Sequence, residues 1–204
     1  MKILMVCLGN ICRSPIAEGV LQHKSQQAGL KWLVESAGTN GYHNGEAPHH
    51  LSQKITASKG IDISNQRSRQ FTKQDFEHYD LIYAMANDVM DDIKEIGGVR
   101  FDSKKTFLFL EELFPGESKD VPDPWYGNEE GYIEVYDLIE KNCDAIVNKY
   151  LNNRRNRFLL IFVLFQIKFD KSIIPEPINL LHLDINLQLS FWEYVSSDSF
   201  TKQI

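Results

Sequence analysis

MVCLGNICRSP, residues 5–15, is the stretch that decides how this 204-residue chain folds. It ends a short apolar run at Cys7, continues through Gly9 and Asn10, and reaches Arg13 at a C-x5-R spacing. A tight glycine-containing loop that leads into a helix turns backbone N–H groups inward and forms a concave anion site. Arg13 adds a planar fork that can bind two phosphate oxygens. We therefore expect a phosphate-binding loop with a thiol at its floor.

The residues on either side of this loop predict a strand before it and a helix after it. Residues 2–8 form a continuous apolar run of strand length, as a buried parallel strand requires. Ser14 is expected as the helix N-cap, with Pro15 at the first helical position. Apolar residues then follow at helical spacing, at Ile16, Ala17, Val20 and Leu21.

The rest of the chain alternates between strand-like and helix-like segments. Strands are predicted over 31–36, 80–85 and 106–110, and helices over 48–59, 88–96 and 132–150. This alternation predicts an α/β fold: a three-layer sandwich whose central four-stranded parallel sheet is flanked by helices, with the phosphate loop after the first strand. A site in such a sheet lies at the carboxyl ends of its strands, where the loop falls.

Net charge limits the classes of binding partner that we expect, and the number of cysteines indicates a cellular compartment. The net charge is −6, so the chain has no general basic surface, and nucleic acid is not expected as a partner. An anion must be captured by a local positive site. Three cysteines do not form a disulfide framework and favour a reducing cytoplasm. The apolar run at the N-terminus is too short and too soon broken for a signal peptide.

The composition changes near Arg154, which predicts a domain over 1–153 and an atypical extension over 154–204 of unassigned role. The apolar run 158–167 is shorter than a membrane-spanning helix. It fits an added strand, a poorly packed tail or an interfacial anchor behind the basic cluster at 154–157, which leaves membrane contact open. No pattern specifies an oligomeric state.

The loop also predicts how a thiol could react. Inward N–H dipoles, a helix N-terminus and Arg13 favour the thiolate of Cys7, which can attack phosphorus in line. Asp123, between two prolines, is the candidate acid for the leaving oxygen, and Trp125 and Tyr126 could wall a cleft for an aromatic group. On local sequence alone, an inert buried Cys7 and an ordinary Pro-Asp-Pro turn are the alternatives.

Together these segments resemble the low-molecular-weight protein tyrosine phosphatase family. The resemblance covers about residues 1–152, and its strongest matches are VCLGNICRSPIAEGV (6–20) and PDPWYG (122–127), with further likeness at 35–39 and 67–76. It implies hydrolysis of phosphotyrosine in proteins, or of small aryl phosphates, through a phosphocysteine intermediate. It implies no cofactor and no metal.

The resemblance also implies residue roles. Cys7 is the nucleophile, Arg13 the phosphate clamp and Asp123 the general acid and later base. The phosphate-binding loop comprises Leu8, Gly9, Asn10, Ile11, Cys12 and Ser14. Ser14 is expected to bond the Cys7 sulfur, and Asn10 to join Ser36 in a supporting network. Cys12 either forms a reversible disulfide with Cys7 or is a packing residue.

The expected substrate rim comprises Tyr42, His43, Trp125 and Tyr126. The histidines have no metal-ligand spacing, and His49-His50 is expected as a solvated helix start.

Three other functions are alternatives to phosphotyrosine hydrolysis. A protein arginine phosphatase shares the scaffold, but that branch tends to have threonine at Ile11. An arsenate reductase needs further cysteines after the third strand, and residues 84–99 contain none. A non-catalytic phosphate-binding protein would be expected to lack one of Cys7, Arg13 and Asp123.

Overall fold

The core of the fold is a sheet of four parallel strands in the order β2-β1-β3-β4. The computed structural model describes residues 1–168, with residues 158–168 described by their backbone alone. The strands are β1 (Lys2–Cys7), β2 (Leu33–Gly38), β3 (Leu81–Ala84) and β4 (Thr106–Leu108). The predicted four-stranded parallel sheet is confirmed.

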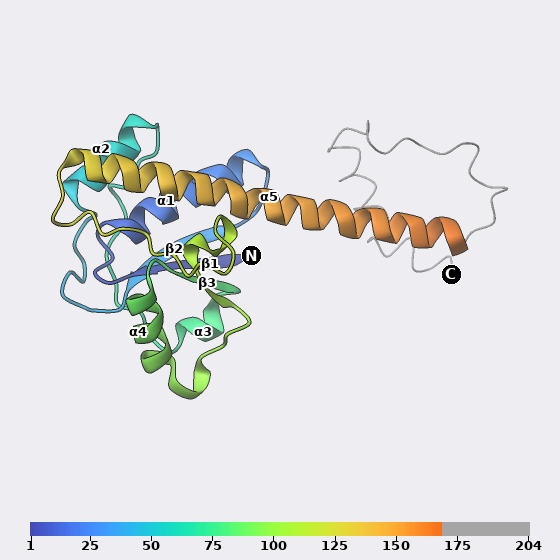
Figure 1. The fold of residues 1–204 in the computed structure, drawn as a ribbon, viewed down its shortest axis with the longest axis horizontal. Helices are drawn as coiled ribbons and strands as arrows, with labels where there is room; N and C mark the ends of the chain where they lie inside the picture. Colours follow the sequence, from blue (N-terminus) through green and yellow to red (C-terminus); the bar gives the residue numbers. More distant parts are fainter. Residues whose placement is uncertain (169–204) are drawn as a thin grey trace. The chain divides into compact units, whose positions relative to one another are not determined.

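Helices cover both faces of this sheet, as Figure 1 shows. On one side lie α1 (Arg13–Gln27), α2 (His50–Ser58) and α5 (Glu129–Lys168). On the other side lie α3 (Asp75–His78) and α4 (Asn87–Gly97). The predicted three-layer sandwich is confirmed, although the sequence analysis did not anticipate the short α3.

Side chains of β1 alternate between two hydrophobic clusters, because successive residues of a strand point to opposite faces. Ile3, Met5 and Cys7 belong to the cluster shared with α1 and α5, and Leu4 and Val6 belong to the cluster shared with α4. The thiol of Cys7 therefore lies on the side of the sheet that α1 covers.

The carboxyl ends of the three neighbouring strands meet where the predicted loop begins. Cys7 pairs with Gly38 of β2, and Val6 pairs with Ala84 of β3. β2 lies two residues later than the predicted 31–36, because Ala37 and Gly38 pair with the last two residues of β1. β4 is shorter than predicted, since a 3-10 turn over Phe109–Glu112 replaces its end.

The predicted N-cap of the first helix is wrong. α1 begins at Arg13, its N-cap is Cys12, and no side chain caps it. The hydroxyl of Ser14, inside the first turn, lies 3.0 Å from the Cys7 sulfur instead. The free N–H groups of this helix start are consequently left for an anion.

α5 is the longest helix and begins three residues before its predicted start. The expected apolar stripe is confirmed, with Tyr132, Tyr136, Ile139 and Cys143 fully buried. The helix continues to Lys168, so the alternative of an added strand over 158–167 is wrong. The remainder of the predicted extension, 169–204, lies outside the described residues. The sheet, helices α1 to α4, the first part of α5 and the site described below lie in the unit Met1–Arg154.

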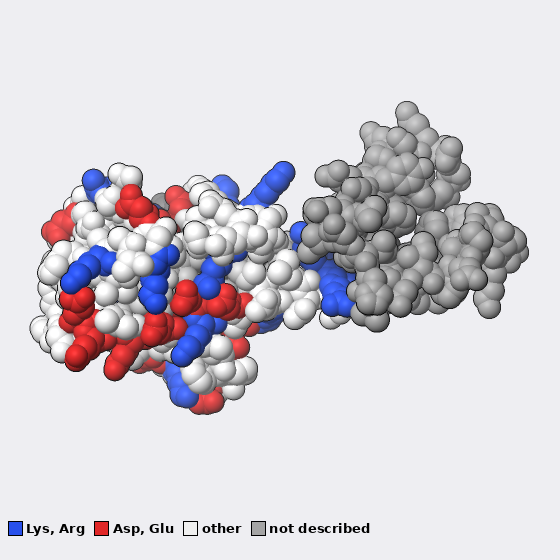
Figure 2. All heavy atoms as spheres, turned by 90° about the horizontal axis from the view of Figure 1, so that it is seen from above, with Lys and Arg blue, Asp and Glu red and all other residues white. Residues whose placement is uncertain are grey.

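Two further properties of the described residues are their surface charge and the hydropathy of their helices. On the face drawn in Figure 2, acidic and basic side chains are interspersed over the described residues. Among residues 1–168, no helix combines the length and apolar character needed to cross a bilayer.

Candidate active site

The loop between β1 and α1 turns its carbonyl groups outward. Three of its carbonyls accept hydrogen bonds from segments around it: from Asn40 N to Leu8 O (3.0 Å), from Ser68 Oγ to Gly9 O (3.2 Å) and from His49 N to Ile11 O (2.8 Å). Within the described part of the chain, the N–H groups of Gly9, Ile11 and Cys12 donate to no protein acceptor. The loop therefore has the polarity of an anion cradle.

The sulfur of Cys7 lies at the floor of this cradle and is 3% exposed. The backbone N–H of Asn10 donates to it at 3.2 Å, and the hydroxyl oxygen of Ser14 lies 3.0 Å away. Because the Asn10 side-chain amide donates to that hydroxyl oxygen, the Ser14 proton is free to point at the sulfur. The sulfur thus lies within reach of two hydrogen-bond donors.

Asn10 is the residue that holds the turn of the loop. Its φ is 54°, a left-handed conformation that asparagine tolerates better than most side chains. Its Oδ1 accepts from the Arg69 backbone N–H at 3.0 Å, and its Nδ2 donates to Ser14 (3.0 Å) and Ser36 (2.7 Å). These three partners fix which end of the amide is nitrogen. The structure thus brings the predicted supporting residue Ser36 to the loop.

The same network ends in a carboxylate of α1. The Ser36 hydroxyl donates to Glu18 Oε2 at 2.6 Å. Burial raises the pKa of Glu18 to about 7, and the charge of nearby Glu35 acts in the same direction. The hydrogen bond from Ser36 and the charge of Arg69 oppose this rise. A titratable group is therefore linked to the Cys7 sulfur by a chain of four hydrogen bonds, through Ser14, Asn10 and Ser36.

Gly38, at the end of β2, lets the strand approach the loop closely because it has no Cβ. A Cβ at this position would lie 2.8 Å from Leu8 O and 3.0 Å from both Asn10 N and the carbonyl carbon of Gly9. All three are backbone atoms of the cradle, which cannot swing aside as a side chain can. The close approach of β2 to the loop therefore requires glycine.

Arg13 joins the cradle to a distant segment. Its guanidinium is buried and donates to Asp123 Oδ2 at 2.8 Å and to the carbonyl oxygen of Val121 at 3.2 Å. Asp123 is 110 positions away in the sequence, and its side chain is 44% exposed. Val121 N–H donates to Met85 O, just beyond β3, which anchors the acid loop (residues 121–127) at the carboxyl edge of the sheet. The structure thus brings two of the residues predicted as catalytic, Arg13 and Asp123, into direct contact, and Arg13 follows the loop that begins at the third, Cys7.

Comparison with known proteins gives this arrangement its family. The sequence model of the family described as "Low molecular weight phosphotyrosine protein phosphatase" matches residues 2–157. The chain belongs to this family. The expected enzyme class, a protein-tyrosine phosphatase, is confirmed with it.

Individual relatives support the assignment over nearly their whole length. The low molecular weight phosphotyrosine protein phosphatase of Gallus gallus is 36% identical over 150 residues, which are 72% of this chain and 94% of the relative. A protein tyrosine phosphatase of Entamoeba histolytica, solved with Hepes in its active site, is 34% identical, with a TM-score of 0.68 over 76% of this chain and 99% of that one. The YwlE arginine phosphatase has 29% identity and a TM-score of 0.68 over the same shares.

In this low molecular weight phosphatase, three of the predicted rim residues and Leu8 of the loop are exposed. Tyr42 is 88% exposed, Tyr126 97%, Trp125 42% and Leu8 40%. Such surfaces can cover the ring of an aryl phosphate. Tyr42 and Tyr126 extend furthest into solvent.

His43, the remaining predicted rim residue, lies against the loop itself. A Cβ on Gly9 would lie 3.1 Å from the His43 Cδ2 atom, so the ring packs directly on the turn. Its Nδ1 lies 3.0 Å from Glu46 Oε2, and its ring centroid is 5.8 Å from that of Trp125. His43 therefore contacts both the cradle and the acid loop of this phosphatase.

The two other cysteines lie in apolar surroundings. The Cys12 sulfur lies 3.2 Å from the hydroxyl oxygen of Tyr132, and burial raises the Cys12 pKa to about 11. Burial likewise raises the pKa of Cys143, which is fully buried in α5. Both are therefore protonated thiols at neutral pH. All three cysteines are free in the structure.

Three residues near the site were missed or misjudged by sequence analysis: Glu18, His49 and Tyr132. Glu18 had a usable signal, since it follows Ser14 by one helical turn and therefore shares its face. The predicted solvated helix start at His49-His50 is confirmed for His50, which is exposed and begins α2, but is wrong for His49, which is half-buried and contacts Tyr132 and Trp125. No local pattern could place these aromatic rings together. Among residues 1–168, no three His, Cys, Asp or Glu side chains group as metal ligands.

Proposed function

We propose that this phosphatase hydrolyses phosphotyrosine in proteins, and small aryl phosphates, with Cys7 as nucleophile, Arg13 as phosphate clamp and Asp123 as general acid and base. The observation that carries the proposal is the 2.8 Å contact between Arg13 and Asp123 beside the cradle. The contact supports the proposed roles because it brings Asp123 beside the residue that would hold the phosphate, within reach of the leaving oxygen.

The first step forms a bond between the Cys7 sulfur and phosphorus. The cradle N–H groups and the guanidinium of Arg13 hold the equatorial phosphate oxygens, and the thiolate attacks in line. The bond from phosphorus to the phenolic oxygen breaks, and that oxygen takes the proton of the Asp123 carboxyl group. Arg13 has five N–H donors, of which two are used by Val121 and Asp123, so others are available to phosphate.

The second step hydrolyses the phosphocysteine. The Asp123 carboxylate takes a proton from water while the water oxygen attacks phosphorus, and the sulfur leaves as a thiolate. The hydroxyl of Ser14 and the N–H of Asn10 stabilise that thiolate. A mutant of the YwlE arginine phosphatase that carries a phosphorylated active-site serine supports a covalent intermediate on this scaffold.

The mechanism is tested by comparing substrates with different leaving groups. Cys7→Ser is expected to reduce hydrolysis of p-nitrophenyl phosphate below detection, because an alcohol is a far weaker nucleophile here than a thiolate. Asp123→Asn is expected to lower kcat/KM for phenyl phosphate by about 10²–10⁴-fold, with a smaller loss for p-nitrophenyl phosphate, whose leaving group needs little protonation.

Asp91→Asn is the matched control, since this exposed carboxylate pairs only with Lys94 in the described structure. It is expected to leave both substrates unaffected. Turnover that survives Cys7→Ser would refute a phosphocysteine, and an equal loss with both substrates in Asp123→Asn would refute its role as acid.

The structural likeness to the YwlE arginine phosphatase makes phosphoarginine the competing substrate. Ile11 is 6% exposed, belongs to the larger hydrophobic cluster and offers no hydroxyl. The exposed aromatic rim also suits a phenyl ring. We therefore expect a phosphotyrosine peptide to be hydrolysed faster than the matching phosphoarginine peptide, and the ratio to fall in Ile11→Thr. The opposite preference in the unmodified protein would favour an arginine phosphatase.

We also propose a reducing compartment, the cytoplasm. The mechanism requires a free Cys7 thiolate, and the three free cysteines support this location. Fractionation of cells that express the full chain tests it.

A further inference from the structure

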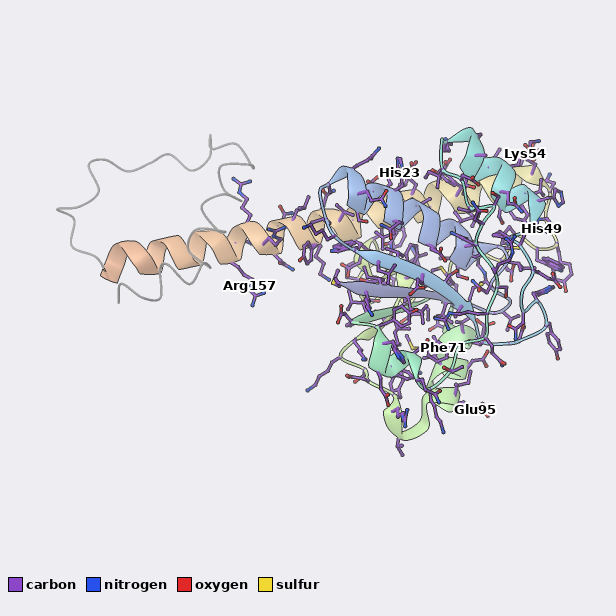
Figure 3. The ribbon with its side chains drawn as sticks, turned by 180° about the vertical axis from the view of Figure 1, so that it is seen from behind. His23, His49, Lys54, Phe71, Glu95 and Arg157 are labelled. Atoms are coloured by element: carbon purple, nitrogen blue, oxygen red, sulfur yellow. The ribbon has the colours of Figure 1, made fainter. Side chains whose placement is uncertain are left out.

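His49 lies where four parts of the site meet. Its backbone N–H donates to Ile11 O of the cradle at 2.8 Å. Its ring is stacked on Tyr132 of α5, with centroids 5.2 Å apart and planes at 15°. The edge of the same ring meets Trp125 of the acid loop at 5.5 Å. Figure 3 labels His49 beside α2, whose N-cap it forms.

Contacts of the imidazole define its protonation and orientation. Nδ1 accepts a hydrogen bond from the Leu51 backbone N–H at 3.3 Å, so in this geometry Nδ1 carries a lone pair and Nε2 the proton. Burial and the neighbouring His50 lower the pKa of His49. The ring is thus a neutral, oriented aromatic surface.

Trp125 connects this ring to Asp123. The Trp125 backbone N–H donates to Asp123 Oδ1 at 3.1 Å, and Asp123 Oδ2 receives the bond from Arg13. The indole ring neighbours two imidazole rings, with centroid distances of 5.5 Å to His49 and 5.8 Å to His43. Because Trp125 is two residues from Asp123, a shift of the indole would move the carboxyl group.

We infer that His49 is a positioning residue for the acid loop: through its contact with Trp125 it holds the Asp123 carboxyl group over the leaving oxygen. This inference rests on the proposed function. It assigns His49 no contact with substrate. Its effect is therefore greatest for substrates whose leaving oxygen needs a proton, and smallest for those whose leaving group is already stable as an anion.

The experiment separates the ring of His49 from its capping role. His49→Asn keeps a side-chain acceptor suited to an N-cap and removes the ring, whereas His49→Phe keeps a ring and removes the acceptor. We expect His49→Asn to lower kcat/KM for phenyl phosphate about tenfold, and for p-nitrophenyl phosphate less than about threefold. His49→Phe is expected to stay within about threefold of the unmodified protein for both substrates.

His23→Asn is the matched control, because His23 lies on α1 and contacts Gln27. It is expected to leave both substrates unaffected. A second measurement uses Trp125→Ala: if His49 acts through Trp125, His49→Asn causes no further loss in that background.

The inference is overturned if His49→Asn lowers kcat/KM equally for both substrates, or if His49→Phe lowers it as much as His49→Asn does. It is also overturned if, in the double variant, the fold-losses in kcat/KM from His49→Asn and Trp125→Ala multiply. Should His49→Asn fail to fold, His49→Ser, which also keeps an N-cap acceptor and removes the ring, gives the same decision. A full chain that hydrolyses neither substrate would instead overturn the proposed function.

Discussion

Single polar side chains hold the cradle in its binding shape. Asn10 satisfies three partners while its own backbone adopts a left-handed conformation, and Ser36 passes that network to Glu18. A buried carboxylate at the end of such a chain is costly to ionise unless it is fully hydrogen-bonded. The folded protein therefore favours protonated Glu18 more than the unfolded chain does.

Glu18 gives the stability of the protein a defined pH dependence. Its pKa rises from 4.5 to about 7 on folding. The stabilisation that protonated Glu18 adds to the free energy of unfolding is therefore fully present below pH 4.5 and is lost as the pH rises through 7. Glu18→Gln keeps an acceptor for Ser36 and cannot ionise. We expect this variant to gain on the order of 2 kcal/mol in unfolding free energy, relative to the unmodified protein, between pH 5 and pH 8. Urea unfolding at both pH values measures this.

Glu134→Gln is the control, because Glu134 is an exposed residue of α5. It should leave the pH dependence unchanged. If unmodified protein and Glu18→Gln lose stability in parallel from pH 5 to pH 8, the pKa of Glu18 is not raised by folding.

At the scale of elements, the site depends on how closely β2 approaches the turn after β1. Pairing of Cys7 with Gly38 carries the strand end up to the cradle, and the absence of a Cβ lets the backbones touch. The outward carbonyls of the loop are then bonded by the segments that follow β2. The inward N–H groups are left for phosphate.

Gly38→Ala should disturb the cradle directly. Its Cβ would lie 2.8 Å from Leu8 O, so the loop must shift, at a cost of about 1–3 kcal/mol in stability. We expect kcat/KM for p-nitrophenyl phosphate to fall more than about tenfold, since misplaced N–H donors stabilise the transition state poorly. Thermal unfolding and steady-state kinetics measure the two effects.

Gly131→Ala is the matched control on α5, where nothing lies within 4 Å of the added methyl group. This substitution should be neutral or slightly stabilising, because alanine favours helix more than glycine does. Unchanged activity in Gly38→Ala would show that the cradle does not need this close contact.

At the scale of the whole molecule, the unit Met1–Arg154 contains every residue assigned to the reaction. Tyr150 and Leu151 of α5 still pack against its larger hydrophobic cluster. The proposed boundary at 153/154 therefore follows the last core contacts, and the unit has the sheet, both helical layers and the acid loop that the mechanism needs.

A chain that ends at residue 154 is expected to fold and to keep kcat/KM for p-nitrophenyl phosphate within roughly twofold of the full chain. A chain that ends at residue 144 is the comparison, since it also lacks the buried Ile146 and Val147. Loss of those side chains should cost several kcal/mol in stability. Circular dichroism measures whether each truncated chain folds, and steady-state kinetics measure its activity. An unfolded or inactive 1–154 chain would contradict this boundary.

Sequence patterns predicted which helices and strands form better than they predicted the residues at which each begins and ends. The apolar runs of β1 and β3 and the stripe of α5 are strong local signals, because burial alone determines them. The end of β2 and the start of α1 were misplaced, since both depend on contacts with the phosphate loop. Ser14 had the residue type of an N-cap, but its hydroxyl is used by Cys7 and Asn10.

By itself, the sequence determined the chemistry of the site: the thiol, the arginine at C-x5-R spacing and the loop that turns N–H groups inward are all contained in residues 5–15. Only the tertiary structure decided which distant groups complete it. Asp123 reaches Arg13 because the acid loop is anchored beyond β3, and His49 meets Trp125 because α2 and α5 cover the same face. Local backbone preferences act over a few residues, whereas these contacts depend on the packing of whole elements around the sheet.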